Sequence, residues 1–237
     1  MPWDAKRFHE LFGKVIQMKR EEARALIEKI GILPSVRVTS RDLAKFAAET
    51  VYASGIPIVE ITLTVPGALE VINDVAGRYP DMVVGAGTVL DETSARQAID
   101  AGARFITSPG LIPEVVGFAR KAEVMVLPGA LTPTEVIAAW KAGADLVKIF
   151  PTGHIGGPQY VRALKVPLPQ IPLIVSGGVN QMTVVDFILA GATAIGVGGE
   201  LLPKEALQFR QVDRIRELAG RFLTQVKAAR TSRETYR

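Results

Sequence analysis

The amino-acid sequence predicts an α/β fold of eight strand–helix units, and three observations support this prediction. Eight short apolar runs rich in Val and Ile recur along the chain, without the polar alternation of strands that face water. Stretches of helical period separate them. The length of 237 residues matches the (β/α)8 barrel, or TIM barrel, which typically has about 250. A doubly wound open sheet is the alternative, but RVTSRD follows the first run where a dinucleotide fingerprint would stand.

The expected strands are short, and each is bounded by a turn or a helical segment. In chain order they cover 31–39, 56–64, 82–90, 104–110, 124–130, 145–151, 173–179 and 193–199. The helices between them carry apolar residues at helical spacing. They cover 41–53, 67–77, 92–101, 113–122, 132–142, 157–165 and 181–190. A further helix is expected on each side of the barrel, over 4–29 before it and over 205–229 after it.

The ends of the expected helices repeat along the chain. The triplet Ala-Gly-Ala closes three of them, at 101–103, 142–144 and 190–192. Glycine just past a helix adopts the left-handed cap conformation without a side-chain clash. Four side chains of the kind that cap a first turn precede helices, namely Ser40, Asp91, Thr132 and Asn180. One structural unit is therefore expected to recur.

Composition and charge indicate a soluble protein of one domain. Residues 1–237 are taken as a single barrel domain, with an N-terminal helical extension over 1–30 and a basic C-terminal tail over 227–237. The net charge of +4 resides in these two ends, so nucleic acid is not expected as a partner. No run reaches the ~18 apolar residues of a membrane span, and no signal-peptide core is present. Without cysteine there is no disulfide or thiolate site, and we expect cytoplasmic residence.

Lys148 is the first candidate for catalysis. It lies in the apolar run LVKIF, and active sites of (β/α)8 barrels lie at the C-terminal ends of the strands. Burial disfavours the charged form of a lysine, and a neutral amine can attack a carbonyl group to form a Schiff base. A structural ion pair with a carboxylate, or a side chain that reaches solvent, is an equally acceptable reading of the sequence.

Glu60 is the second candidate, because a carboxylate within PIVEITLT is costly to bury without a partner or a function. Strand alternation places Glu60, Thr62 and Thr64 on one face, which we expect to point into the barrel. There the carboxylate could serve as general acid and base. An ion pair with Arg37 is the structural alternative, and both readings can hold together.

Two glycine-bearing turns follow the last two strands, SGGVN over 176–180 and GVGGE over 196–200. In many (β/α)8 barrels this is where backbone N–H groups hold a phosphate. The candidate glycines are Gly177, Gly178, Gly198 and Gly199. A metal site is not expected, because the two histidines, His9 and His154, cannot form a three-histidine site and no zinc-ligand spacing is present.

These segments together resemble a known family. They are EITLTVP, VGAGTV, ITSPG, LPGALTPTE, GADLVKIFP, SGGVN and IGVGG, in unbroken order within 31–203. As a set they are similar to 2-keto-3-deoxy-6-phosphogluconate (KDPG) aldolase, in the class I group that includes the galactonate-type and 4-hydroxy-2-oxoglutarate (KHG) aldolases. The resemblance implies a (β/α)8 barrel, assembly as a homotrimer, and catalysis without a metal or other cofactor.

The resemblance also implies roles for individual residues. Lys148 would form the Schiff base, and Glu60 would be the general acid and base. The implied substrate contacts are Thr88 for the pyruvate carboxylate, Pro109, Phe150 and Ser176 around the pyruvyl group, and Gly177 and Gly178 for a distal phosphate. The implied reaction joins Lys148 to C2 of a 2-keto-3-deoxy sugar acid. Glu60 takes the C4 hydroxyl proton through water, and the C3–C4 bond breaks to give pyruvate enamine and an aldehyde.

Two positions depart from the family pattern. Thr64 stands where the pattern E-[IV]-T-L-R has an arginine. Arg37 is a candidate replacement, because an arginine can bind a carboxylate through two parallel hydrogen bonds. Glu200 stands where a serine commonly donates to the phosphate, and a carboxylate at a helix N-terminus could occupy the anion site itself. We therefore expect an aldehyde partner less negative than a phosphotriose, or weak phosphate binding.

Three functions are compatible with these residues. The favoured one is a class I pyruvate aldolase with a KDPG-like substrate, with KHG or an unphosphorylated 2-keto-3-deoxy acid as the alternative substrate. The second is a barrel that binds a metabolite, or serves as a scaffold, without turnover. The third is another phosphate-binding barrel, such as an isomerase, which would need the glycine turns but not Lys148.

Overall fold

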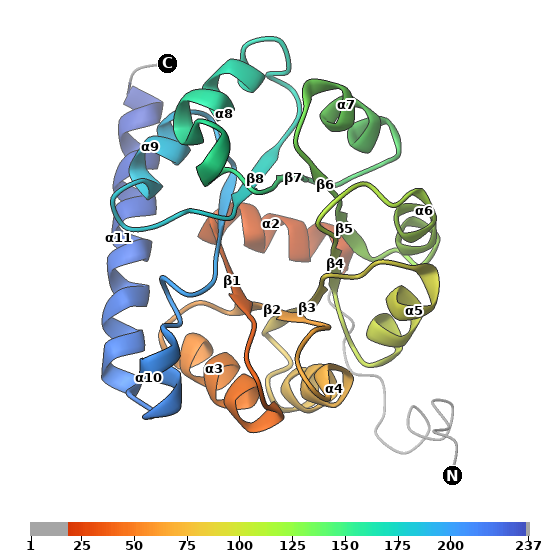
Figure 1. Ribbon diagram of the computed structural model, residues 1–237, viewed down its shortest axis with the longest axis vertical. Coiled ribbons are helices and arrows are strands. Elements are labelled where there is room, and N and C mark those ends of the chain that lie inside the picture. The colour runs from red at the N-terminus through yellow and green to blue at the C-terminus, as the bar shows by residue number, and fades with distance from the viewer. Residues whose placement is uncertain (1–18, 236–237) are drawn as a thin grey trace.

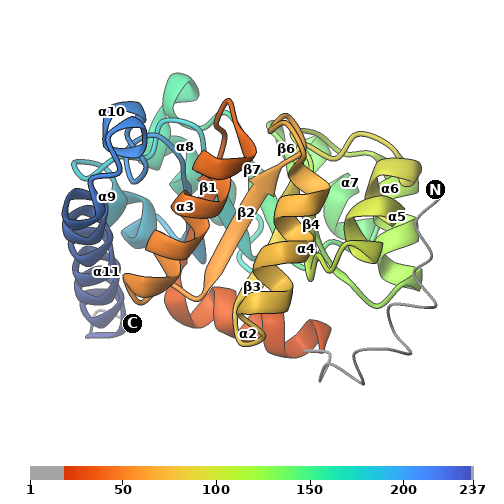
Figure 2. The same ribbon diagram turned by 90° about the horizontal axis from the view of Figure 1, so that it is seen from below.

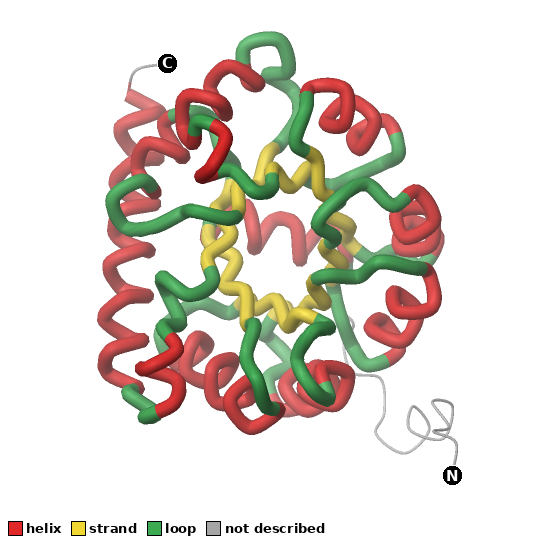
Figure 3. Tube along the Cα trace, viewed as in Figure 1, coloured by secondary structure: helices red, strands yellow, loops and turns green. Residues whose placement is uncertain are grey.

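The computed structural model describes residues 19–235, and its strands form a nearly closed parallel barrel surrounded by helices (Figures 1 and 3). The strands are β1 (Ile32–Val36), β2 (Ile58–Thr62), β3 (Val83–Gly87), β4 (Phe105–Thr107), β5 (Met125–Leu127), β6 (Gly129–Ala130), β7 (Val147–Ile149), β8 (Leu173–Ser176) and β9 (Ala194–Val197). Their order around the sheet is β5-β4-β3-β2-β1-β9-β8-β7-β6. The (β/α)8 prediction is confirmed.

The fifth expected strand, 124–130, is observed as two short strands instead of one. It is divided into β5 and β6 by Pro128, whose nitrogen has no hydrogen to donate to the sheet. The nine segments therefore occupy eight places around the barrel. The carbonyl of Pro128 still accepts the N–H of Lys148, at 2.9 Å. Gly129 approaches the backbone of Pro109 so closely that a Cβ would overlap it.

Among residues 19–235, seven helices connect successive strands and cover most of the outside of the barrel (Figure 1). They are α3 (Arg41–Ala53), α4 (Ala68–Arg78), α5 (Glu92–Asp100), α6 (Pro113–Lys121), α7 (Pro133–Lys141), α8 (Gly157–Lys165) and α9 (Val184–Leu189). Strands β2 and β3 are buried at every residue, as expected for strands with helices outside and packed side chains within.

The side chains of Ser40, Asp91 and Thr132 cap α3, α5 and α7, as their positions predict. Asn180 acts differently. Its Oδ1 accepts the N–H groups of Met182 and Thr183, at 2.9 and 3.1 Å. Asn180 therefore closes a turn before the helix, and α9 begins later than expected, at Val184.

Helix α2 (Arg20–Ile30) lies across the end of the barrel where the strands begin (Figure 2). It contacts β5 and β9, which are separated in the barrel by β7 and β8. Its own residues Ala23 and Ile27 are fully buried. Arg20 bonds both oxygens of the buried Asp145, at 2.5 and 3.1 Å. The N-terminal helix predicted over 4–29 is thus partly seen, and its portion before residue 19 lies outside the described residues.

The prediction of a single helix over 205–229 is wrong in two respects. The chain forms a short α10 (Lys204–Gln208) and then α11 (Val212–Thr235), separated where Arg210 takes a positive φ of 49°. Helix α11 also runs into the predicted basic tail. There Arg230 donates to the carbonyls of Lys29 and Thr193, at 2.6 and 2.7 Å. Within residues 19–235, no helix combines the length and the apolar character needed to span a membrane.

Candidate active site

The two candidate catalytic residues meet inside the barrel. Glu60 is the third residue of β2 and Lys148 the middle residue of β7, and these strands face each other across the ring. The distance between Lys148 Nζ and Glu60 Oε2 is 3.6 Å, and the two side chains are 13% and 3% exposed. Lys148 therefore points inward, toward a carboxylate.

Two hydroxyl groups complete the surroundings of Glu60. Ser35 Oγ donates to Oε1 and Thr107 Oγ1 donates to Oε2, each at 2.6 Å. Burial alone would raise the pKa of Glu60, but the attraction of Lys148, the two hydroxyl bonds and the weaker attraction of Arg37 together hold this pKa below its ordinary value. The carboxylate is thus buried and ionised.

The ion pair of Glu60 is with Lys148, and not with Arg37 as the structural alternative predicted. Arg37 follows β1, and its guanidinium donates to Thr88 Oγ1 at 3.2 Å. Thr88 has a positive φ of 60°, which is unusual for a β-branched residue and is typical of strained positions near functional sites. Thr64 follows β2, and its hydroxyl is 2.9 Å from that of Thr62.

Phe150, which follows β7, and the glycine turn after β8 form a second part of the barrel mouth, by which we mean the end of the barrel where the strands finish. The ring centroid of Phe150 is 5.7 Å from Lys148 Nζ. Gly177, with a φ of 79°, packs against this ring, since a Cβ would lie 3.0 Å from it. Gly178, with a φ of 96°, would place a Cβ 2.6 Å from the Cα of Gly153. Glycine is required at both positions, and Ser176 ends the strand that leads into the turn.

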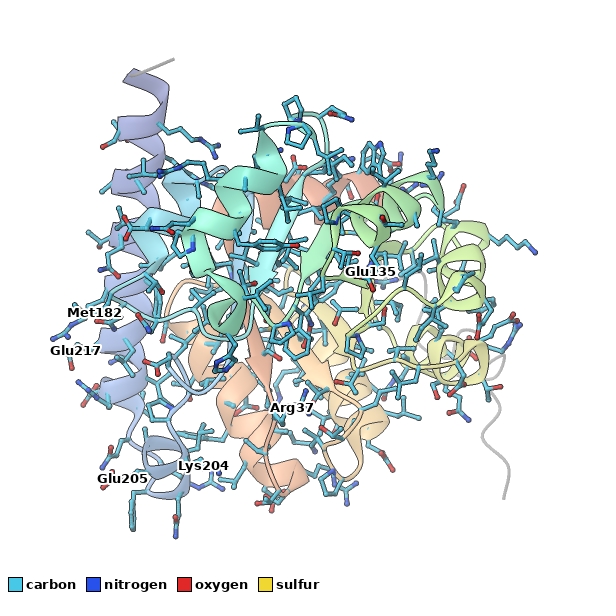
Figure 4. The ribbon with its side chains drawn as sticks, turned by 45° about the horizontal axis from the view of Figure 1, so that its top comes forward. Arg37, Glu135, Met182, Lys204, Glu205 and Glu217 are labelled. Atoms are coloured by element: carbon cyan, nitrogen blue, oxygen red, sulfur yellow. The ribbon has the colours of Figure 1, made fainter. Side chains whose placement is uncertain are left out.

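The third part of the mouth is the turn after β9, which contains Gly198, Gly199 and Glu200. The N–H groups of Leu201 and Leu202 donate to Gly198 O, at 3.0 and 2.9 Å. Because α10 begins only at Lys204, Glu200 is an exposed turn residue and not a helix N-terminus, which corrects the prediction. Figure 4 shows Lys204 on α10 at the periphery and Arg37 nearer the centre of the view.

Three residues close to Glu60 were not singled out by sequence reasoning, namely Ser35, Thr107 and Gly87. Gly87 ends β3, and a Cβ there would overlap the Glu60 carboxyl group. The hydroxyl residues carried a usable signal, because each is a polar residue within an otherwise apolar strand, ILPSV or FIT. Among residues 19–235, no cluster of three or more His, Cys, Asp or Glu is arranged to hold a metal ion.

An amine and a carboxylate 3.6 Å apart inside a (β/α)8 barrel are groups that enzymes of this fold use for acid–base chemistry. Comparison with known proteins gives the family. The family model for KDPG and KHG aldolases matches residues 24–218 of this chain. The protein belongs to that family.

Individual relatives agree with this assignment. The chain is 32% identical to a 2-dehydro-3-deoxy-phosphogluconate aldolase of Pseudomonas aeruginosa, over 87% of this chain and 96% of the relative. It is 28% identical, with a TM-score of 0.77, to KDPG aldolase from Legionella pneumophila, whose crystal structure holds pyruvate as a covalent carbinolamine intermediate. That match covers 83% of this chain and 96% of the other. A designed porous cage made by fusing symmetric oligomeric domains matches with 30% identity and a TM-score of 0.79, over 88% of this chain and 76% of the cage chain.

Proposed function

We propose that the protein is a class I aldolase that reversibly cleaves a 2-keto-3-deoxy sugar acid to pyruvate and an aldehyde. The observation that carries the proposal is the buried pair of Lys148 and Glu60, 3.6 Å apart. Membership of the KDPG and KHG aldolase family supports it, as does the carbinolamine of pyruvate in the Legionella relative.

In the proposed reaction, the neutral amine of Lys148 adds to the C2 carbonyl, and loss of water from the carbinolamine leaves an imine. Glu60 is close enough to accept the proton that Lys148 must lose first, and it returns this proton to the hydroxyl group that leaves the carbinolamine as water. Through one water, Glu60 then takes the proton of the C4 hydroxyl. The imine is protonated on nitrogen, so the C3–C4 electron pair moves toward that nitrogen, the aldehyde departs and a neutral enamine remains. Protonation at C3 and addition of water release pyruvate and the free lysine.

We assign the substrate contacts from the arrangement of the mouth. Arg37 and Thr88, already bonded to each other, would hold the carboxylate of the pyruvyl part, in place of an arginine at the position of Thr64. Pro109, Phe150 and Ser176 would line the pyruvyl pocket. The distal group would meet the turns that contain Gly177, Gly178, Gly198 and Gly199. Glu200, exposed in the last turn, would disfavour a dianionic phosphate there.

Reduction by borohydride in the presence of pyruvate tests the activity directly. We expect a covalent adduct on the peptide that contains Lys148, and we expect Lys148→Ala to abolish both the adduct and cleavage. Wild-type protein without an adduct would show a barrel that binds or scaffolds without this chemistry. Phosphorylated and unphosphorylated 2-keto-3-deoxy acids, and KHG, should then be compared by kcat/KM. A large preference for the phosphorylated acid would contradict the role given to Glu200.

Three further parts of the proposal concern the molecule as a whole. We propose that it acts in the cytoplasm, that it needs no metal or other cofactor, and that it assembles as a homotrimer. The likeness to a cage built from symmetric oligomeric domains supports a symmetric assembly. Cleavage that is unchanged after treatment with a metal chelator is the expected result for the second part.

A further inference from the structure

Two hydroxyl groups that the proposed reaction does not use enclose the Glu60 carboxylate. Ser35 lies on β1 directly beside Glu60 in the strand register, and its Oγ is 2.6 Å from Oε1. Thr107 ends β4, and its Oγ1 is 2.6 Å from Oε2. Thr107 is fully buried. Each carboxyl oxygen thus has one hydroxyl partner, from a different strand.

The hydrogen-bond pattern favours one protonation state of Glu60. A carboxylate accepts through both oxygens, whereas a protonated carboxyl group must donate through one of them. With Ser35 and Thr107 both donating, protonation would oblige one hydroxyl to reverse its direction. Hydrogen bonds of about 2.6 Å are typical of a hydroxyl that donates to a charged oxygen.

Thr107 also touches the other half of the pair. Lys148 Nζ donates to Thr107 Oγ1 at 3.4 Å. One hydroxyl therefore bonds to the amine and the carboxylate at once, donating to the carboxylate and accepting from the amine. This arrangement fixes the direction of Glu60 relative to the nitrogen that would become the imine.

We infer that Ser35 and Thr107 are positioning residues of the aldolase reaction, which hold Glu60 as an ionised carboxylate aimed at Lys148. The inference rests on the proposed function, because it concerns the base of that reaction. According to this inference, the hydroxyl groups of β1 and β4 keep the base of the reaction ionised in acidic solution. Removal of either hydroxyl should make Glu60 easier to protonate and less well aligned.

Thr107→Val and Ser35→Ala remove the hydroxyls, and Thr107→Ser restores one of them. The assay is the exchange of the methyl hydrogens of pyruvate with deuterated water, followed by NMR across pH, together with kcat and KM for cleavage. Exchange requires an imine and a base that removes a C3 proton. For both hydroxyl-deletion variants we expect kcat to fall about tenfold and the acid limb of the profile to move up by about one pH unit. KM should change little, and Thr107→Ser should behave as wild type.

Thr50→Val is the matched control. Thr50 is buried and donates to the carbonyl of Phe46 within α3, so this variant loses a buried hydroxyl away from the site. An unchanged acid limb in Thr107→Val and Ser35→Ala would overturn the inference, as would an equal shift in Thr50→Val. Should Thr107→Val not fold, Ser35→Ala and Thr107→Ser decide the same question. Wild-type protein that neither exchanges pyruvate hydrogens nor forms the borohydride adduct would instead refute the proposed function.

Discussion

Glu60 shows how single residues keep a charge inside the barrel. Its burial opposes ionisation, and the carboxylate stays charged because Lys148, two hydroxyl donors and, more weakly, Arg37 stabilise the charge. A lysine and a glutamate within apolar strands were visible in the sequence. Their partners were less so, because Ser35 and Thr107 lie far from Glu60 in the chain and reach it only through the order of the strands.

The lowered pKa of Glu60 predicts how stability depends on pH. Between the folded pKa and the ordinary value of 4.5, the unfolded chain binds more protons than the folded one, so stability rises with pH. The contribution is complete above 4.5 and is lost as pH falls through the folded value. The free energy of unfolding, from urea titrations, should therefore fall more steeply with acid in wild type than in Glu60→Gln. Parallel curves for the two proteins would contradict this account.

Gly87 lies against the Glu60 carboxyl group, and the lack of a side chain at position 87 leads to a prediction. In Gly87→Ala, the new methyl group would overlap the Glu60 carboxyl group and displace it from Lys148. We expect cleavage to fall about 100-fold or more, since a misplaced catalytic group costs about that much. Gly77→Ala, in α4, is the control, because a Cβ there meets nothing within 4 Å and alanine favours the helix. Equal activity in both variants would refute the overlap.

At the scale of elements, helix α2 is attached to the barrel by an ion pair. Arg20, 19% exposed, bonds both oxygens of Asp145, which is 3% exposed and also accepts the N–H of Val126 at 2.9 Å. Removal of one partner from a buried pair leaves an unpaired charge, which is more costly than the loss of an exposed pair. The residues at the base of the barrel therefore contribute to stability, while those at the mouth carry the proposed chemistry.

Arg20→Leu should lower the free energy of unfolding by about 3–5 kcal/mol, because it leaves Asp145 buried without its cation. Arg24→Leu, which breaks the exposed pair with Glu28, should cost about 1 kcal/mol or less. Urea denaturation of the two variants measures the difference. Adding Asp145→Asn to Arg20→Leu should recover part of the loss, and no recovery would show that the arginine acts through packing alone.

The sequence was sufficient for the alternation of elements and for most helix caps, because apolar period and capping residues are local signals. It was insufficient for two interruptions. The division of the fifth strand at Pro128 depends on a single residue within an apolar run. The break at Arg210 lacks the glycine or proline that usually marks the end of a helix, so the turn there was not foreseen.

At the scale of the whole molecule, the barrel brings together residues from segments far apart in the chain. Local patterns placed Glu60 and Lys148 on strands, and the parity of β2 predicted an inward face for Glu60. Only the closed order of strands makes β2 and β7 face each other. The direction of each side chain and its hydroxyl partners depend on how distant strands pack together, which no local pattern encodes.

Assembly is the prediction that belongs to the whole molecule. We expect light scattering coupled to size-exclusion chromatography to give three times the mass of one chain, since the family resemblance implies a homotrimer. The mass should not change over a tenfold dilution series if the interface is stable. A mass equal to one chain at all concentrations would contradict the proposal.

The position of α2 across the base of the barrel also bears on the order of events (Figures 1 and 2). Because α2 covers that end in the described part of the chain, we expect the substrate and both products to pass through the mouth at the other end. Pyruvate, tethered to Lys148, would sit deepest, and the aldehyde would stand between it and solvent. The aldehyde must then leave first during cleavage and arrive second during synthesis, so the sequence of steps is imposed by architecture as well as by chemistry.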